Sequence, residues 1–162
     1  MNKKIIDADR LAQIAAEVRA QRRKLVFTNG CFDLLHVGHI RYLEAARSLG
    51  DALAVGINGD QSVRELKGVD RPLNGEDDRA EVIAALECVD HVVIFPEVRA
   101  THLLEQVRPA IYVKGGDYTS ASLHAEERGV LEKIGAEVRI VPFEPGHSTS
   151  GLIERLRKLG TP

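Results

Sequence analysis

The sequence is poor in aromatic residues, in cysteine and in long apolar runs, and each shortage excludes a class of protein. It has no tryptophan and 4% aromatic residues, which disfavours a platform for stacked nucleic-acid bases. Its two cysteines, Cys31 and Cys88, belong to no Cys-x-x-Cys pair, so neither a disulfide framework nor a four-cysteine zinc site can form. No apolar run reaches the roughly 20 residues that a membrane-spanning helix needs, and the N-terminus lacks a signal-peptide pattern. We therefore expect a cytoplasmic protein.

Charged residues form no long block of one sign. The sequence has 22 basic and 24 acidic residues, a formal net charge of −2 and a pI near 6.3. Because binding along nucleic acid needs clustered positive charge, we expect neither nucleic acid nor a membrane as partner. The length of 162 residues and the 44% hydrophobic content predict a single domain, 1–162, with a leader helix in 1–24 and the core in 25–160.

Short apolar runs alternate with segments of helical spacing. Residues 7–23 place Leu11, Ile14, Ala15 and Val18 on one stripe, which predicts an amphipathic helix whose apolar surface could serve self-association. Strands are predicted at 25–28, 53–57, 92–95, 111–113 and 138–141, and further helices at 40–49, 77–86, 101–107, 123–134 and 148–159. This order predicts a Rossmann-like α/β three-layer sandwich, with a five-stranded parallel sheet and helices on both faces.

In such a sheet, ligands bind beyond the carboxyl ends of the strands. Polar, glycine-containing segments follow the first, second, fourth and fifth predicted strands, at 29–33, 58–60, 114–117 and 144–150. The segment after the first strand leads into a helix that begins near Val37, whose free N–H groups favour a phosphate. His36 and His39, three residues apart, project from the same side of its first turn. Two imidazoles are thus expected to face one anion.

Neither common nucleotide fingerprint is present, since no Gly-x-Gly-x-x-Gly and no Gly-x4-Gly-Lys-Ser/Thr follows a predicted strand. The element His-x-Gly-His, preceded by Thr-Asn-Gly-Cys-Phe-Asp, instead resembles the nucleotidyltransferase superfamily of cytidylyltransferases and pantetheine-phosphate adenylyltransferase. The resemblance is narrower to the adenylyltransferase domain of bacterial ADP-heptose synthases. The segments that carry it are 29–39, 66–72, 85–93, 113–118 and 146–150.

The resemblance implies an enzyme that transfers AMP from ATP to D-glycero-β-D-manno-heptose 1-phosphate. The products are ADP-heptose, for the lipopolysaccharide core, and pyrophosphate. Mg²⁺ is expected to bridge the phosphates with few direct protein ligands. We also expect the stand-alone form of the domain, served by a kinase on a separate chain, and a homo-oligomer.

Site residues follow partly from position and partly from the resemblance. The expected catalytic residues are His36, His39 and Lys67. Lys114 ends a buried strand, where a charge without an anionic partner would be costly. The expected nucleotide-binding residues are Asn29, Gly30, Cys31, Phe32, Gly38, Lys114, Gly116, Asp117, Ser148, Thr149 and Ser150. The expected substrate-binding residues are Asp33, Arg71 and Arg79. The alternatives for these residues are solvated basic groups, a turn at 114–117 and simple N-capping by Ser148 or Thr149.

Three other functions compete with this one. His36 and His39 could bind zinc together with Asp33 in a hydrolase, although that would leave the phosphate-binding loop unexplained. A nucleotide-binding sensor could keep the fold without turnover. A cytidylyltransferase could use CTP and glycerol 3-phosphate, but such enzymes carry an arginine shortly before the Ser-Thr-Ser element, and 141–147 has none.

Overall fold

Parallel strands and helices alternate along most of the chain. The computed structural model describes residues 2–116, 123–142 and 146–159. The helices are α1 (Ala8–Ala20), α2 (Val37–Arg47), α3 (Asp60–Lys67), α4 (Glu76–Ala84), α5 (Thr101–Val107), α6 (Ala125–Ile134) and α7 (Thr149–Leu159). The strands are β1 (Leu25–Gly30), β2 (Ala52–Asn58), β3 (His91–Phe95), β4 (Ile111–Gly115) and β5 (Glu137–Val141).

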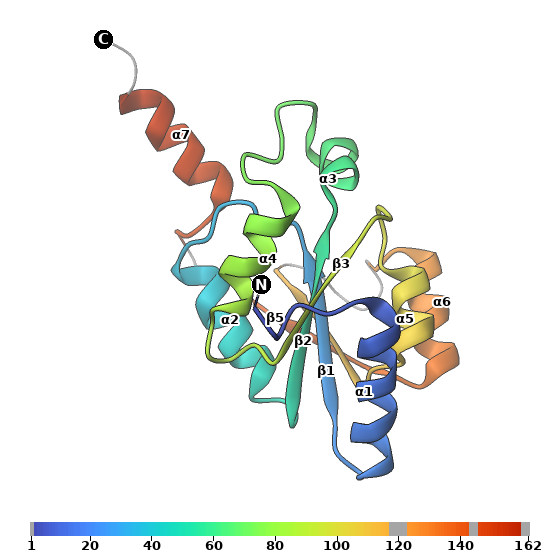
Figure 1. Ribbon diagram of the computed structural model, residues 1–162. Helices are drawn as coiled ribbons and strands as arrows, with labels where there is room; N and C mark the ends of the chain where they lie inside the picture. The colour runs from blue at the N-terminus through green and yellow to red at the C-terminus, as the bar shows by residue number, and fades with distance from the viewer. Residues whose placement is uncertain (1, 117–122, 143–145, 160–162) are drawn as a thin grey trace.

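The strands form one five-stranded sheet in the order β3-β2-β1-β4-β5, and every pairing is parallel. Helices α1, α5 and α6 cover one face, and α2 and α4 cover the other (Figure 1). A separate apolar cluster fills each space between sheet and helices, because the central strands are apolar on both faces. The predicted three-layer α/β sandwich is confirmed.

Helix α1 begins at an N-cap and packs inward. The Asp7 carboxylate accepts a hydrogen bond from the Arg10 N–H at 2.7 Å, which satisfies one of the unpaired donors of the first turn. Its apolar stripe buries Leu11, Ala15 and Val18 in the cluster shared with β1 and α5. The expectation that this stripe serves self-association is wrong, since the chain itself covers it. Homo-oligomer formation stays a prediction.

Two elements differ from the prediction. Helix α3 was not expected, because only Ser62 and Val63 of its eight residues are buried and no apolar stripe marks it. Strand β5 lies at the edge of the sheet, and its Glu137 and Arg139 side chains are exposed. An edge strand is often exposed on one face. The prediction that helices cover the strands on both faces therefore holds only for the central strands.

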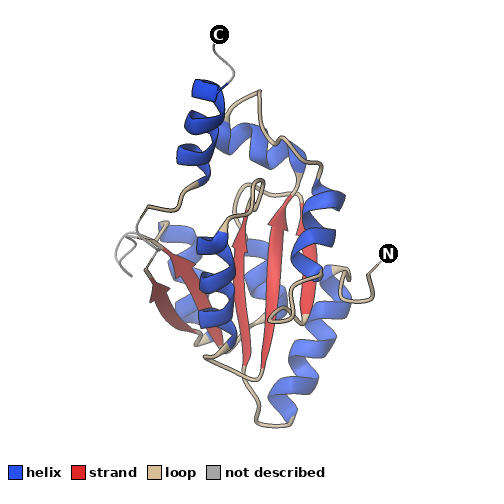
Figure 2. Ribbon diagram, turned by 90° about the vertical axis from the view of Figure 1, so that its left-hand side faces the viewer, coloured by secondary structure: helices blue, strands red, loops and turns tan. Residues whose placement is uncertain are grey.

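Helices α3 and α7 lie beyond the carboxyl ends of the strands (Figure 2). Helix α7 extends away from the sheet, and none of its described residues is buried. Within the described residues, no helix combines the length and apolar character that crossing a bilayer requires. The two helices with the least buried apolar surface therefore lie at the carboxyl edge of the sheet.

Candidate active site

Strands β1 and β4 separate toward their carboxyl ends, where the order of strands reverses. Their register covers Val26–Ile111 and Phe27–Tyr112 only, whereas β1 pairs with β2 from Leu25 to Gly30. The chain leaves β1 for α2 on one face and leaves β4 for α6 on the other. Such a reversal is the usual ligand site of an open α/β sheet. We call the region between the carboxyl ends of β1 and β4 the switch point.

A tyrosine spans the switch point on each face of the sheet. On the α2 face, the buried Tyr42 hydroxyl donates to the Val113 carbonyl at 3.1 Å and lies 2.6 Å from the Thr28 Oγ1. Burial raises the pKa of Tyr42, which keeps the phenol protonated. On the α6 face, the Tyr112 hydroxyl donates to Asn29 Oδ1 at 2.8 Å. The two side chains thus connect β1 and β4 where backbone pairing has ended.

His36 and His39 cap the beginning of α2 with their own rings. The Gly38 N–H donates to His36 Nδ1 at 3.1 Å, and the His36 N–H donates to His39 Nδ1 at 3.3 Å. The ring centroids lie 4.0 Å apart. Because each Nδ1 accepts a backbone hydrogen bond, the proton of each neutral ring resides on Nε2. Both histidines therefore offer an Nε2–H donor at a helix N-terminus, where an anion is favoured.

Burial and neighbouring imidazoles keep both rings neutral at pH 7. Burial and the neighbouring His36 lower the pKa of His39 to about 4. Burial, followed by the charge of His147, lowers the pKa of His36. An anion bound between the rings would favour their charged forms and raise both pKa values. The pair can thus supply neutral donors at rest and positive charge as negative charge develops.

The loop between β1 and α2 is tightly bent at Phe32. This residue has φ of 46°, a left-handed conformation that side chains other than glycine seldom adopt. Its ring lies 5.6 Å from the His39 ring, and a Cβ on Gly30 would come within 3.0 Å of the Phe32 ring. The bend therefore places the Phe32 ring beside His39, and glycine at position 30 leaves room for that ring.

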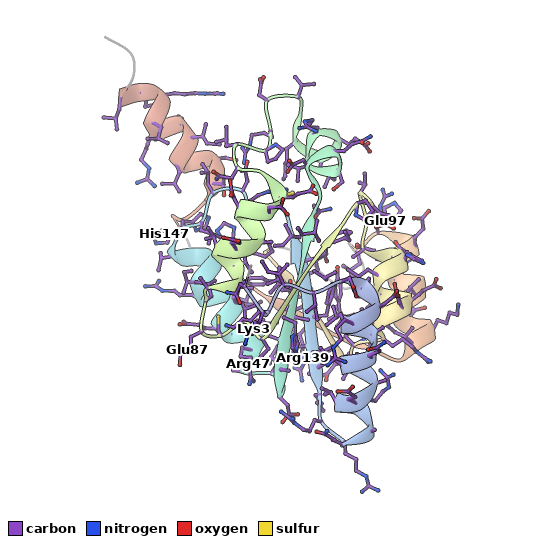
Figure 3. All side chains as sticks on the ribbon, viewed as in Figure 1. Lys3, Arg47, Glu87, Glu97, Arg139 and His147 are labelled. Carbon is purple, nitrogen blue, oxygen red and sulfur yellow. The ribbon has the colours of Figure 1, made fainter. Side chains whose placement is uncertain are left out.

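The beginning of α7 meets the beginning of α2. The Thr149 Oγ1 donates to the Leu34 carbonyl at 3.2 Å, and the Ser148 Oγ caps α7 by accepting from the Gly151 N–H at 3.0 Å. His147, labelled in Figure 3, places its ring centroid 6.3 Å from that of His36. A Cβ on Gly38 would come within 2.9 Å of the His36 ring and 3.3 Å of the His147 Cβ, so glycine there leaves room for the His36 ring. Two helix N-termini and three imidazoles thus converge.

Asp33 anchors the loop between α3 and α4. Its carboxylate accepts from Arg71 Nε at 2.6 Å and from the Leu73 and Asn74 N–H groups, each at 2.9 Å. Burial would raise the pKa of Asp33, but the Asn74 and Leu73 donors and Arg71 together lower it. Asp33 and Arg71 contact each other, and both oxygens of the Asp33 carboxylate accept hydrogen bonds from the chain itself. The structure therefore supports an anchoring role for the pair.

Arg79 lies beneath the site rather than at its surface. Its side chain is 1% exposed and donates to the Cys31 carbonyl at 2.6 Å, the Asn74 carbonyl at 3.0 Å and Asp60 Oδ1 at 2.8 Å. The expected contact between Arg79 and substrate needs an accessible guanidinium, so the structure corrects this assignment. Arg79 instead ties the loop after β1 to the beginnings of α3 and α4.

Two lysines bring positive charge to the site from different elements. Lys67 is exposed at the end of α3, and its charge opposes the rise that burial causes in the pKa of the Cys31 thiol. Gly68 follows with φ of 103°, which lets the chain turn sharply after Lys67. Lys114 is mostly buried at the carboxyl end of β4, and Gly116, with φ of 100°, follows it. Asp117 lies outside the described residues.

Residues 27–155 match the family described as cytidylyltransferase-like. The chain belongs to the cytidylyltransferase-like family. It is similar to two proteins named "Bifunctional protein HldE". The one from Geobacter sulfurreducens is 50% identical over 96% of this chain, and the one from Geotalea uraniireducens is 51% identical over 95%. The chain spans 31% of the length of each of these relatives.

Solved structures show the same architecture. The lipopolysaccharide core biosynthesis protein from Thermoplasma volcanium is 31% identical, with a TM-score of 0.62 over 75% of this chain and 97% of that one. The pantoate-beta-alanine ligase from Francisella tularensis shares the fold at 16% identity, with a TM-score of 0.56 over 91% of this chain and 69% of that one. The predicted family is thus confirmed, and so is the predicted enzyme class, nucleotidyltransferase.

The structure also shows site residues that had no predicted role. Asn74 donates its Nδ2–H to the Asp33 carbonyl at 2.7 Å, and Asp60, which lies in the polar segment 58–60, pairs with Arg79. Tyr42 and Tyr112 had no motif to mark them. The zinc alternative loses its third ligand, because Asp33 already accepts hydrogen bonds at both oxygens. The segment 58–60 was expected near the site because it follows a strand, but nothing in it marked Asp60 as the partner of Arg79.

Proposed function

We propose that this chain transfers AMP from ATP to D-glycero-β-D-manno-heptose 1-phosphate, which gives ADP-heptose and pyrophosphate. The observation that carries the proposal is the interlocked pair His36–His39 at the N-terminus of α2, beside the switch point of a cytidylyltransferase-like domain. The pair faces the place where a triphosphate would meet the helix N-terminus.

The chemistry requires the site to hold two anions and to stabilise charge in the transition state. A phosphate oxygen of the acceptor attacks the α-phosphorus of ATP, and the bond from that phosphorus to the β-phosphate breaks. Negative charge grows on the equatorial and leaving oxygens. The Nε2–H donors of His36 and His39 would stabilise it in a partly buried site, where such hydrogen bonds are strong. Lys67 and Lys114 would neutralise the remaining phosphate charge.

Mg²⁺ is proposed to enter with the triphosphate. In the part of the chain that the structure describes, no group of three or more histidine, cysteine, aspartate or glutamate side chains could hold a metal ion. The oxygens of Asp33, the buried carboxylate of the loop after β1, are committed to Arg71, Leu73 and Asn74. The residues present therefore fit an ion that the phosphates carry, and such an ion would neutralise part of their charge.

The acceptor is inferred from the relatives. Proteins about half identical over nearly the whole chain bear the name HldE, and a 31% identical structure is described as a lipopolysaccharide core biosynthesis protein. The segments that resemble ADP-heptose synthases include the His-x-Gly-His element and the loop at 66–72. A phosphorylated heptose as acceptor implies a kinase reaction that supplies it.

A matrix of triphosphates and acceptors tests the proposal. Purified protein is incubated with ATP or CTP, Mg²⁺, and heptose 1-phosphate or glycerol 3-phosphate, and pyrophosphate release is followed. We expect release with ATP and heptose 1-phosphate, at a kcat/KM well above that of every other combination. A preference for CTP with glycerol 3-phosphate would contradict the proposed substrates. Absence of release with all pairs would favour a sensor.

A further inference from the structure

A buried pair of opposite charges lies on the α6 face of the switch point, across the sheet from the histidines. The Lys114 and Glu127 side chains are 17% and 7% exposed, and Nζ lies 3.9 Å from Oε2. The Lys114 Nζ also lies 5.5 Å from the centroid of the Tyr112 ring. Glu126, next to Glu127 in the first turn of α6, is exposed. The helix therefore turns one particular carboxylate toward β4.

A gain in stability does not explain why Lys114 and Glu127 are buried as an ion pair. Removing two charges from water costs several kcal/mol per ion, and apolar residues of similar volume are often at least as stabilising. The separation of 3.9 Å exceeds the roughly 2.8 Å of a direct charge-assisted hydrogen bond. Glu127 thus acts on Lys114 mainly through its charge.

Contacts connect the pair to the loop that precedes the histidines. Lys114 lies over the Tyr112 ring, and the Tyr112 hydroxyl donates to Asn29 Oδ1 at 2.8 Å. Asn29 lies in β1, two residues before Cys31. A continuous set of side chains, Glu127, Lys114, Tyr112 and Asn29, therefore runs from α6 across β4 to β1. It places the ammonium at the carboxyl edge of the sheet.

We propose that Glu127 is a positioning residue that keeps Lys114 charged and holds it at the switch point, where its ammonium binds a phosphate oxygen of ATP. This inference rests on the proposed function. No motif of the sequence marks Glu127, and charged residues in the first turn of a helix are usually solvated.

The electrostatics of Lys114 give the proposal a measurable signature. Burial lowers the pKa of Lys114, whereas Glu127 on α6 and then Cys31 after β1 oppose this shift. Among the described residues, these two groups and the Tyr112 phenol of the same strand are the titratable groups shown to act on it. Loss of the Glu127 charge should therefore lower the pKa of the ammonium further, so that Lys114 loses its proton at a lower pH.

Calorimetric titration with ATP and Mg²⁺, without acceptor, between pH 7 and 10.5 tests this signature. We expect the parent affinity to fall at alkaline pH, and Glu127→Gln to move that fall about one pH unit lower, which weakens binding roughly tenfold in the affected range. Glu126→Gln is the matched control and should reproduce the parent curve. Glu127→Asp, which keeps the charge, should restore most of the affinity. A parent-like curve for Glu127→Gln would overturn the proposal.

The variant Lys114→Met keeps the proposal testable if Glu127→Gln does not fold. We expect Lys114→Met to bind ATP more weakly at pH 7 and to lack the parent's alkaline fall. If its curve matches the parent's, Lys114 does not bind the phosphates and the inference fails. Since no acceptor is present, a failure of the heptose assignment leaves this result unaffected, and the two failures are distinguishable.

Discussion

At the scale of single residues, the histidine pair has two roles that depend on opposite sides of each ring. Each Nδ1 accepts a backbone N–H of the first turn of α2, in the way that a serine or aspartate cap usually does. Each Nε2 remains as a donor. The cap fixes the tautomer and the orientation of both rings, so the donors are positioned before any ligand arrives.

Replacement of His39 by asparagine should separate these two roles. The Oδ1 of His39→Asn can accept the His36 N–H, but the variant lacks the Nε2–H donor. We expect kcat to fall about 100-fold or more at pH 7, as for loss of one transition-state donor elsewhere, with an unchanged urea unfolding curve at that pH. His102→Asn changes an exposed histidine on α5 and should leave both unaffected. Near-parent kcat in His39→Asn would remove His39 from the mechanism.

The low pKa of His39 predicts a dependence of stability on pH. In the unfolded chain, a histidine titrates near 6.5, whereas the pKa of His39 in the folded protein is about 4. Between these values the unfolded state binds more protons, so the contribution of His39 to stability is complete above about pH 6.5 and is lost as the pH falls toward 4. Urea unfolding of parent and His39→Asn across this range measures it. The parent should lose stability more steeply; equal slopes would refute a lowered pKa.

At the scale of elements, the loop between α3 and α4 is fixed by residues distant in the sequence. Asp33 receives Arg71 and the backbone at Leu73 and Asn74, and Arg79 joins the same loop to the Cys31 carbonyl. Lys67 ends the helix that precedes this loop. The position of Lys67 relative to the histidines therefore depends on buried polar contacts rather than on apolar packing.

Substitution of Asp33 should loosen this connection. Asp33→Asn removes the charge that faces Arg71 and places an amide NH2 against one of the N–H donors that the carboxylate now accepts from. We expect a loss of about 2 kcal/mol or more in the free energy of unfolding, with reduced kcat/KM. Asp70→Asn, an exposed aspartate of the same loop, is the control and should change stability by less than about 0.5 kcal/mol. Equal effects of the two substitutions would contradict an anchoring role.

Helix α7 should matter for ligand binding more than for stability. None of its described residues is buried, and Thr149 joins it to the loop before α2 through the Leu34 carbonyl. A chain that ends after Pro142 should therefore unfold within about 1 kcal/mol of the parent. Its affinity for ATP should fall at least about tenfold, since the N-terminus of α7 is lost. Calorimetry on the shortened chain measures this; parent affinity would exclude α7 from the phosphate site.

At the scale of the whole molecule, the fold could be predicted because its signals are local. Apolar runs such as 53–57 and 92–95 mark strands, and helical spacing between them implies parallel crossovers. Helix α3 was not predicted, because Val63 is its one buried apolar residue and most of its other residues are exposed. Its formation depends on tertiary contacts, including the hydrogen bond that Arg79 donates to Asp60.

The site could be predicted only where function leaves a local motif. His36, Gly38 and His39 lie in one short element, and their positions follow from it. The roles of Asp33 and Arg79 could not be inferred, because each depends on partners tens of positions away along the chain. Glu127 has the same appearance in the sequence as its exposed neighbour Glu126, and only the packing of α6 on β4 separates them.

The fate of the ATP phosphates tests the central claim most directly. The protein is given Mg²⁺, heptose 1-phosphate and ATP labelled at either the α- or the γ-phosphorus, and the products are separated. If the α-phosphorus is attacked at the histidine pair, the α-label appears in the nucleotide sugar and the γ-label in pyrophosphate. Transfer of the γ-label to the sugar, with release of ADP, would show phosphoryl transfer and contradict nucleotidyl transfer by this site.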